Sequence, residues 1–172
     1  MALAIALFVV GVFSWTFVEY LIHGWMSHVF KTFATPLHAV HHKDPTAVFT
    51  LGAWPPTAAL WVGLFLWRGW SSGVIFYSGL VCGFAAYEFL HYRIHYARSG
   101  SALESRLRAH HLVHHERRPD ACFGVTTTLW DRIFGSEPEA SEMARLSASV
   151  SQTPLTAPSN LRRVLSYAFP LS

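Results

Sequence analysis

Histidine is the residue type whose number and spacing in this sequence most directly imply chemistry. All eleven histidines of the 172-residue chain fall into four short clusters, and none is left over. A lone histidine is most often a satisfied core or interface residue, but that explanation does not account for eleven clustered ones. The clusters are His23 and His28; His38, His41 and His42; His91 and His95; and His110, His111, His114 and His115.

The spacing within the clusters indicates which imidazoles converge, because helical positions three and four apart share a face. Three sets have this spacing: His38 with His41 and His42, His91 with His95, and His111 with His114 and His115. His23 and His28 are five apart, which is about 140° around a regular helix. A helix end, a π-bulge or a pocket approached from two sides is needed to bring that pair together. His110 lies on a different face from the trio that follows it, which leaves ten well-placed imidazoles.

This number of imidazoles predicts two metal ions. Imidazole suits zinc, copper, iron and nickel, so the ligand type alone does not name the metal. Tetrahedral zinc takes four ligands, so two zinc ions would use eight at most. Ten imidazoles suit two ions of coordination number five or six, with room for oxygen or water, and this favours iron.

Neutral ligands leave the charge of such ions uncompensated, so we expect carboxylates to accept hydrogen bonds from the outer ring N–H groups. The acidic residues that flank the clusters are Glu19, Asp44, Glu88, Glu116, Asp120 and Asp131. A carboxylate-bridged site in a helix bundle would need two Glu-x-x-His elements. Only Glu88 to His91 forms one, so the sequence favours a site built from imidazoles.

Long apolar segments indicate that the histidines lie beside a membrane. The chain is 52% hydrophobic and 13% charged, against roughly 25% charged residues in soluble domains. Residues 2–22 carry one charge and suit a helix that crosses roughly 30 Å of hydrocarbon. No basic residue opens this segment and no small-residue cleavage site closes it, so we expect a retained helix. Residues 56–67 and 74–90 predict a membrane hairpin that begins at Pro55-Pro56, either fully crossing or re-entrant.

The basic residues predict the orientation. Ten of the thirteen lie at or beyond Arg93, in the compartment of the histidines, and the positive-inside bias makes that side the cytosol. No basic stripe is interleaved with exposed aromatics, so nucleic acid is not expected as a partner. We predict an all-α, multi-pass integral membrane protein with a cytosolic helical cap that carries the histidines. Residues 1–135 would form the membrane-embedded domain. Residues 136–172 would form a poorly ordered Ser/Ala/Pro-rich tail with one or two helical turns and an amphipathic piece at 161–169.

The order of the clusters resembles the fatty acid hydroxylase / sterol desaturase superfamily, nearest to its fatty acid 2-hydroxylase branch. The resemblance covers residues from about 15 to 136. The segments that carry it are EYLIHGWMSH, LHAVHHKDP, WPP, EFLHYRIHY, HHLVHH and FGVTTTLWDRIFG. The last, residues 123–135, is similar to the segment that follows the final histidine box in that branch. Here one membrane helix precedes the first box and no haem domain is fused.

The resemblance implies a membrane-bound di-iron monooxygenase that hydroxylates a C–H bond of a lipid acyl chain. Its cofactors would be two iron ions, which zinc can replace in a purified sample, with O2 as co-substrate. The family's metal ligands map to His23, His28, His38, His41, His42, His91, His95, His111, His114 and His115. No catalytic residue beyond these ligands and no other cofactor-binding residue is expected.

The implied reaction needs two electrons, and the chain has no flavin or haem motif. An external electron-transfer protein is therefore expected as a partner, namely a reductase, a ferredoxin or a b-type cytochrome. The basic residues expected either to dock an acidic carrier or to contact anionic lipid are Arg106, Arg108, Arg117 and Arg118.

Other functions share parts of this pattern. A carotenoid ring hydroxylase, a sterol or alkyl-lipid oxidase and a desaturase use the same histidine boxes and differ in the cavity. A metal-binding or metal-transporting membrane protein without catalysis would place its ligands within the membrane helices or in a low-complexity tract. Here the histidines lie just outside the apolar runs at helical spacings, which favours a catalytic cluster.

Overall fold

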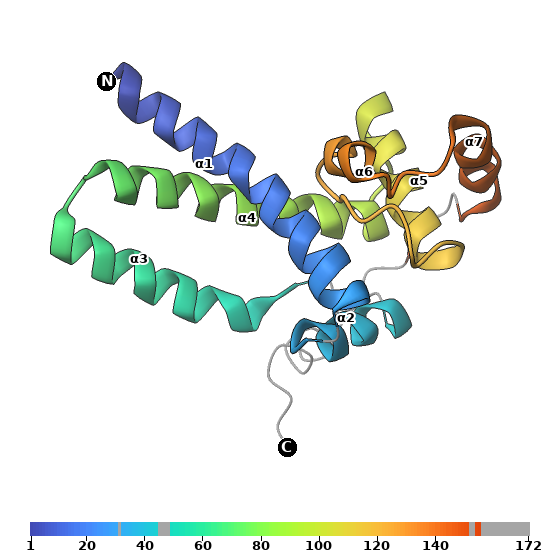
Figure 1. Cartoon of the computed structure of the whole chain (residues 1–172), viewed down its shortest axis with the longest axis horizontal. Helices are drawn as coiled ribbons and strands as arrows, with labels where there is room; N and C mark the ends of the chain where they lie inside the picture. Colours follow the sequence, from blue (N-terminus) through green and yellow to red (C-terminus); the bar gives the residue numbers. More distant parts are fainter. Residues whose placement is uncertain (31, 45–48, 152–153, 156–172) are drawn as a thin grey trace.

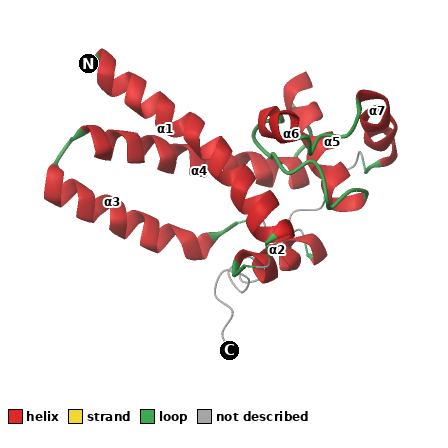
Figure 2. Ribbon diagram, in the orientation of Figure 1, coloured by secondary structure: helices red, strands yellow, loops and turns green. Residues whose placement is uncertain are grey.

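The computed structural model describes residues 1–30, 32–44, 49–151 and 154–155, and every regular element in these ranges is helical (Figure 2). The elements are α1 (Ala2–Tyr20), the π-helix η1 (Leu21–Val29), α2 (Ala34–Lys43), the 3-10 helix η2 (Leu51–Ala53), α3 (Trp54–Arg68), α4 (Ser72–Tyr96), α5 (Ala102–Glu116), α6 (Leu129–Phe134) and α7 (Ala140–Ser149). The predicted all-α class is confirmed.

Two helices are long and apolar enough to cross a membrane. They are Ala2–Val29, with 28 residues and a mean hydropathy of 2.0, and Ser72–Tyr96, with 25 residues and a mean hydropathy of 1.5. Figure 1 shows α1, α3 and α4 extending away from the remaining helices. Where α1 crosses α4, a Cβ added to Gly11 would lie 3.0 Å from the Cα of Gly79. Only residues this small let two helix backbones approach so closely.

Helix α3 begins where the double proline predicted, with proline in its first turn. Its 15 residues span about 22 Å, which is less than roughly 30 Å of hydrocarbon. Two indole groups tie it to α4: Trp61 Nε1 donates to Ser78 Oγ at 2.8 Å, and Trp54 Nε1 donates to Glu88 Oε2 at 2.8 Å. The segments 54–68 and 72–96 therefore form the expected helical hairpin.

At the far end of these long helices, two small apolar cores hold the histidine-bearing elements. One contains Ile94, Leu107 and Val125, and the other contains Leu112, Val113, Ala121, Cys122 and Val150. Both cores include residues of α5, which carries the last histidine cluster. Burial of α5 from two sides fixes the direction of its histidines.

Residues 140–149 form a longer helix than the one or two turns expected in the tail. They form α7, whose Met143 and Leu146 pack against the core that contains Val150. These three residues recur at helical spacing and give α7 an apolar face, although the segment as a whole is rich in serine and alanine. The predicted domain boundary at 135 stays a prediction, and the predicted amphipathic piece at 161–169 lies outside the described residues.

Candidate metal centre

The ten histidines predicted as ligands come together in two adjacent groups of five. The first histidine group is His23, His28, His38, His42 and His114; the second histidine group is His41, His91, His95, His111 and His115. Within each group, one ring nitrogen of every member lies within 4.8 Å of the corresponding nitrogens of the others. The groups adjoin, because the rings of His42 and His115 stack with centroids 4.3 Å apart. That these residues bind metal stays a prediction.

Helices α2 and α5 contribute to both groups. Consecutive helical residues differ in direction by about 100°, so His41 and His42 face different groups, as do His114 and His115. The sequence predicted each trio as one convergent set, whereas the structure divides each trio between the groups. The division arises because α2 and α5 lie between η1 on one side and α4 on the other.

The π-helix η1 explains the five-residue spacing of the first cluster. Ser27 Oγ donates to Ile22 O at 2.7 Å, and Phe30 N donates to Trp25 O, five residues back, at 2.6 Å. The wider π turn brings positions five apart close to one face. The ring centroids of His23 and His28 therefore lie 6.0 Å apart. Of the three explanations considered for the five-residue spacing, the structure shows the π-helical one.

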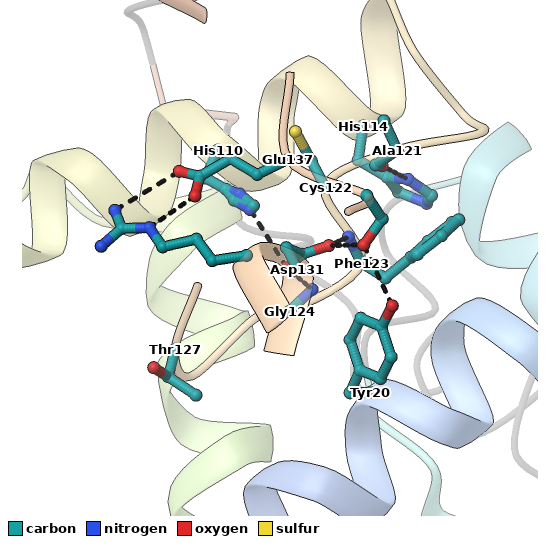
Figure 3. Close-up of polar contacts among 12 residues, drawn as sticks. Tyr20, His110, His114, Ala121, Cys122, Phe123, Gly124, Thr127, Asp131 and Glu137 are labelled. Atoms are coloured by element: carbon teal, nitrogen blue, oxygen red, sulfur yellow. Dashed lines mark hydrogen bonds and ion pairs between the residues drawn. The ribbon is translucent and has the colours of Figure 1, made fainter. Parts of the chain in front are cut away.

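The outer nitrogens of two rings in the first group are held by backbone carbonyls. His23 Nδ1 lies 2.5 Å from Phe123 O and His114 Nδ1 lies 2.8 Å from Ala121 O, as Figure 3 shows for His114. A carbonyl only accepts, so both Nδ1 atoms carry the hydrogen and both Nε2 atoms of the neutral rings carry lone pairs. These Nε2 atoms face each other at 3.1 Å. Two facing lone pairs repel unless a cation lies between them.

Other ring nitrogens at the centre also lack hydrogen-bond partners. Among the described residues, both nitrogens of His41, Nε2 of His28 and Nε2 of His115 are buried with none. Buried polar atoms are nearly always satisfied in native proteins, and a bound cation would satisfy these.

The spacing of the ring nitrogens tests which coordination fits. Two nitrogen ligands about 2.1 Å from an ion lie about 3.0 Å apart at a right angle and about 3.4 Å apart in a tetrahedron. The observed Nε2–Nε2 distances are 2.8 Å for His38–His42, 2.9 Å for His42–His114, 3.0 Å for His91–His111 and 3.1 Å for His95–His111. Each of these distances is short enough for both nitrogens to bind the same ion. The donor set thus suits metal ions.

Burial keeps the rings in the neutral form that binds metal. Burial, reinforced by neighbouring histidines, lowers the pKa of His38 to about 3 and that of His42 to about 4. The same causes lower the pKa of His41, His111 and His115 from the ordinary value. An imidazole must be deprotonated to ligate, so these groups need not lose a proton at neutral pH.

The carboxylates act differently from the prediction that they hold the outer ring N–H groups. Glu19 Oε1 accepts from the N–H of Thr126 at 2.8 Å and from its hydroxyl at 2.7 Å. Glu88 accepts from Trp54 and from the amide of Thr50. Asp131 accepts from backbone amides of the loop before α6. These three carboxylates hold the segments around the histidines. The rings of His23 and His114 are held instead by backbone carbonyl oxygens, which cannot be identified from residue types in the sequence.

His110 belongs to neither group, as expected. Its Nε2 lies 3.3 Å from Asp131 Oδ2 (Figure 3).

Three of the four arginines expected on a docking face contact their own chain. Arg117 donates to Ser149, and Arg118 pairs with Asp120 and Glu142. Arg108 is buried and donates to the carbonyl of Ile94. Arg106 is exposed and, unlike the exposed Arg117, makes neither a hydrogen bond nor an ion pair with a described residue.

An apolar cavity of about 490 Å³ lies between α1, α3 and α4. Phe8, Trp54, Trp61 and Ile75 are among the residues that line it. The indole of Trp54 links this cavity to Glu88, one turn from the His91 ligand candidate on α4. Trp54 is thus the lining residue of the cavity that connects it, through Glu88, to the helix turn that carries His91.

Comparison with known proteins gives a consistent family match. The model described as fatty acid hydroxylase matches residues 8–136. A dihydroceramide fatty acyl 2-hydroxylase of Arabidopsis thaliana is 32% identical over 149 residues, which is 80% of this chain and 62% of the relative. A ceramide very long chain fatty acid hydroxylase of Schizosaccharomyces pombe is 32% identical (85% and 46%), and a fatty acid 2-hydroxylase of Mus musculus is 34% identical (76% and 39%). The chain thus spans 39 to 62% of these relatives. No solved structure matches it.

Proposed function

We propose that this chain, which belongs to the fatty acid hydroxylase family, is a membrane-bound di-iron monooxygenase that hydroxylates a C–H bond of a lipid acyl chain. The observation that carries the proposal is the convergence of ten imidazoles into two adjacent groups of five. The substrate class is supported by two relatives, a dihydroceramide fatty acyl 2-hydroxylase and a ceramide very long chain fatty acid hydroxylase.

Each histidine group would hold one iron ion. The lone pairs of His23 and His114 point at each other, and five imidazoles in each group suit an ion with more than four ligands. Bound iron would supply the O2 activation that the reaction requires. The residues of this chain keep the rings neutral by burial, fix their tautomers and exclude bulk water from the second group, four of whose five rings are buried.

The acyl chain would occupy the apolar cavity between α1, α3 and α4, whose lining is aromatic and aliphatic. From there its reactive carbon would approach the histidine groups past Trp54. With the long helices in the bilayer, the positive-inside bias places the groups on the cytosolic face. We therefore assign the chain as a multi-pass membrane protein with residues 1–135 as the catalytic domain and 136–172 as a C-terminal tail.

Hydroxylation consumes one O2, two electrons and two protons, and yields an alcohol and water. The electrons would come from an external electron-transfer protein. With Arg108, Arg117 and Arg118 engaged within the chain, the exposed Arg106 is the member of the basic set left for an acidic carrier.

The decisive experiment combines metal analysis with lipid mass spectrometry. The purified wild-type protein is expected to hold two iron ions per chain, and membranes of an expressing strain are expected to gain acyl lipids heavier by one oxygen. His114→Ala should abolish the new lipids. A loss of two hydrogens would indicate a desaturase, and oxygen on sterol or carotenoid would indicate the rival hydroxylases. Bound metal with unchanged lipids would leave a binding protein.

A further inference from the structure

The three residues Ala121, Cys122 and Phe123 form a carbonyl clamp on the first histidine group. The outer two carbonyls accept hydrogen bonds from His114 Nδ1 at 2.8 Å and His23 Nδ1 at 2.5 Å. These two rings come from α5 and from η1, 91 residues apart in the chain. The clamp therefore fixes a ring of η1 and a ring of α5 relative to each other. It also leaves the Nε2 atoms of both rings free to donate their lone pairs to a metal ion.

The backbone of the clamp has an unusual conformation. Cys122 has a φ of 59°, in the left-handed region, and is the only residue other than glycine with positive φ in the described ranges. Such a conformation is sparsely populated by residues with a side chain and persists only where surrounding contacts hold it. At Cys122 it reverses the chain locally, so that the carbonyls on either side reach the same histidine group.

Asp131 supplies the contacts that hold the clamp. Its side chain is fully buried. Oδ1 accepts from the amide of Phe123 at 2.8 Å, and Oδ2 accepts from the amide of Gly124 at 2.8 Å (Figure 3). Ser136 Oγ donates to Oδ1 at 2.7 Å, and the carbonyl of Ser136 accepts from the amide of Cys122 at 3.0 Å. Each carboxylate oxygen accepts from a different one of two adjacent amides. The side chain of Asn has only one acceptor atom, and its NH2 group would face the other amide N–H.

In the described part of the chain, no backbone carbonyl accepts a hydrogen bond from the rings of His41, His95, His111 or His115 in the second histidine group. Among the described residues, both nitrogens of His41 and Nδ1 of His111 are buried without a hydrogen-bond partner. Its rings are directed by three regular helices, α2, α4 and α5. A disturbance at Asp131 would therefore reach one group and not the other.

We infer that Asp131 is a positioning residue for one metal only: through the carbonyl clamp it holds His23 and His114 in the ligating tautomer and sets the metal affinity of the first histidine group. The inference rests on the proposed function, in that the groups must bind metal. Removal of partners that orient metal ligands commonly weakens binding about 10- to 100-fold.

The test is a titration of metal-free protein in detergent with Co²⁺, counting bound ions and following the ligand-field absorption. Wild type should bind two ions. Asp131→Asn should bind the second-group ion as wild type does and the other about 10- to 100-fold more weakly. The control is Glu19→Gln, which loosens Val125 and Thr126 in the same loop through an equally buried carboxylate but does not touch the clamp. It should bind both ions normally.

The outcomes separate the two proposals. If wild type binds no Co²⁺, the proposed function fails. If wild type binds two ions and Asp131→Asn binds both normally, or loses both equally, the inference about Asp131 is wrong. A second measurement needs no variant: ¹⁵N spectra of the metal-free wild type should show His114 protonated on Nδ1, and protonation on Nε2 would overturn the clamp.

Discussion

The two histidine groups have the same number of rings and differ in what directs them. The second group is built on regular helices, with its paired rings four residues apart on α4 and on α5, and four of its five rings are buried. The first group depends on a π-helix and on a clamp with a left-handed residue, and three of its five rings are partly exposed. Regular helices give a rigid site without further support, whereas the more open site needs hydrogen bonds to fix its ligands.

The largest effect should follow from removing a ring at the centre of the rigid group. His111 Nε2 lies 3.0 Å from His91 Nε2 and 3.1 Å from His95 Nε2, and the residue is fully buried. His111→Ala should remove the second-group ion and reduce lipid hydroxylation to the background of cells without the protein. Metal analysis should still find close to one ion per chain, because the first group keeps all five rings. Loss of both ions would show that the groups do not bind independently.

The next effect concerns the close crossing of α1 and α4, the long helices from which the two histidine groups take part of their rings. The continuation of α1 carries two rings of the first group, α4 carries two rings of the second group, and α1 and α4 touch at Gly11 and Gly79. Gly79→Leu should force the backbones apart and lower the free energy of unfolding by about 1–3 kcal/mol or more, as overpacking does. Thermal unfolding in detergent measures it.

Gly63→Ala on α3 is the matched control, since a Cβ there meets nothing within 4 Å. It should change stability by less than about 1 kcal/mol, in the stabilising direction. Equal destabilisation by both variants would contradict the role of the close crossing.

Much of this arrangement was predictable from spacing, and the exceptions have physical causes. The ten rings were identified because three- and four-residue intervals define helix faces, and the interval between His23 and His28 required an irregularity that η1 supplies. The division of each trio was not predictable, because it depends on where η1 and α4 pack against α2 and α5. The clamp was missed because its acceptors are backbone carbonyls, which every residue carries. The length of helix α7 was underestimated, because the serine- and alanine-rich composition obscured the apolar face of Met143 and Leu146.

A smaller effect is expected from acid on the metal-free protein. Burial lowers the folded-state pKa of His38 to about 3 and of His42 to about 4, while the unfolded chain titrates near about 6.5. The unfolded state therefore binds more protons between these values, so stability is fully present above pH of about 6.5 and falls as pH drops toward about 3. Each ring contributes a slope of up to about 1.4 kcal/mol per pH unit.

Urea unfolding at several pH values measures this slope. Bound metal should compete with protons and shift the loss of stability to lower pH. Stability that rises as pH falls below about 6.5 would contradict neutral, buried rings.

The smallest effect is a local one and reports on the clamp itself. Cys122 is fully buried, and burial raises the pKa of its thiol to about 12, so at neutral pH almost none of the reactive thiolate is present or accessible. Alkylation of Cys122 in the native protein should therefore be slow compared with the urea-unfolded protein, as followed by mass spectrometry of the peptide. Asp131→Asn should accelerate it by loosening the clamp, and Glu19→Gln should do so less, because Glu19 holds Val125 and Thr126 beyond it. If metal binding slows the alkylation further, the first histidine group and the clamp are structurally coupled. If neither bound metal nor Asp131→Asn changes the alkylation rate, the geometry of the first group is set by the helices alone, as in the second group.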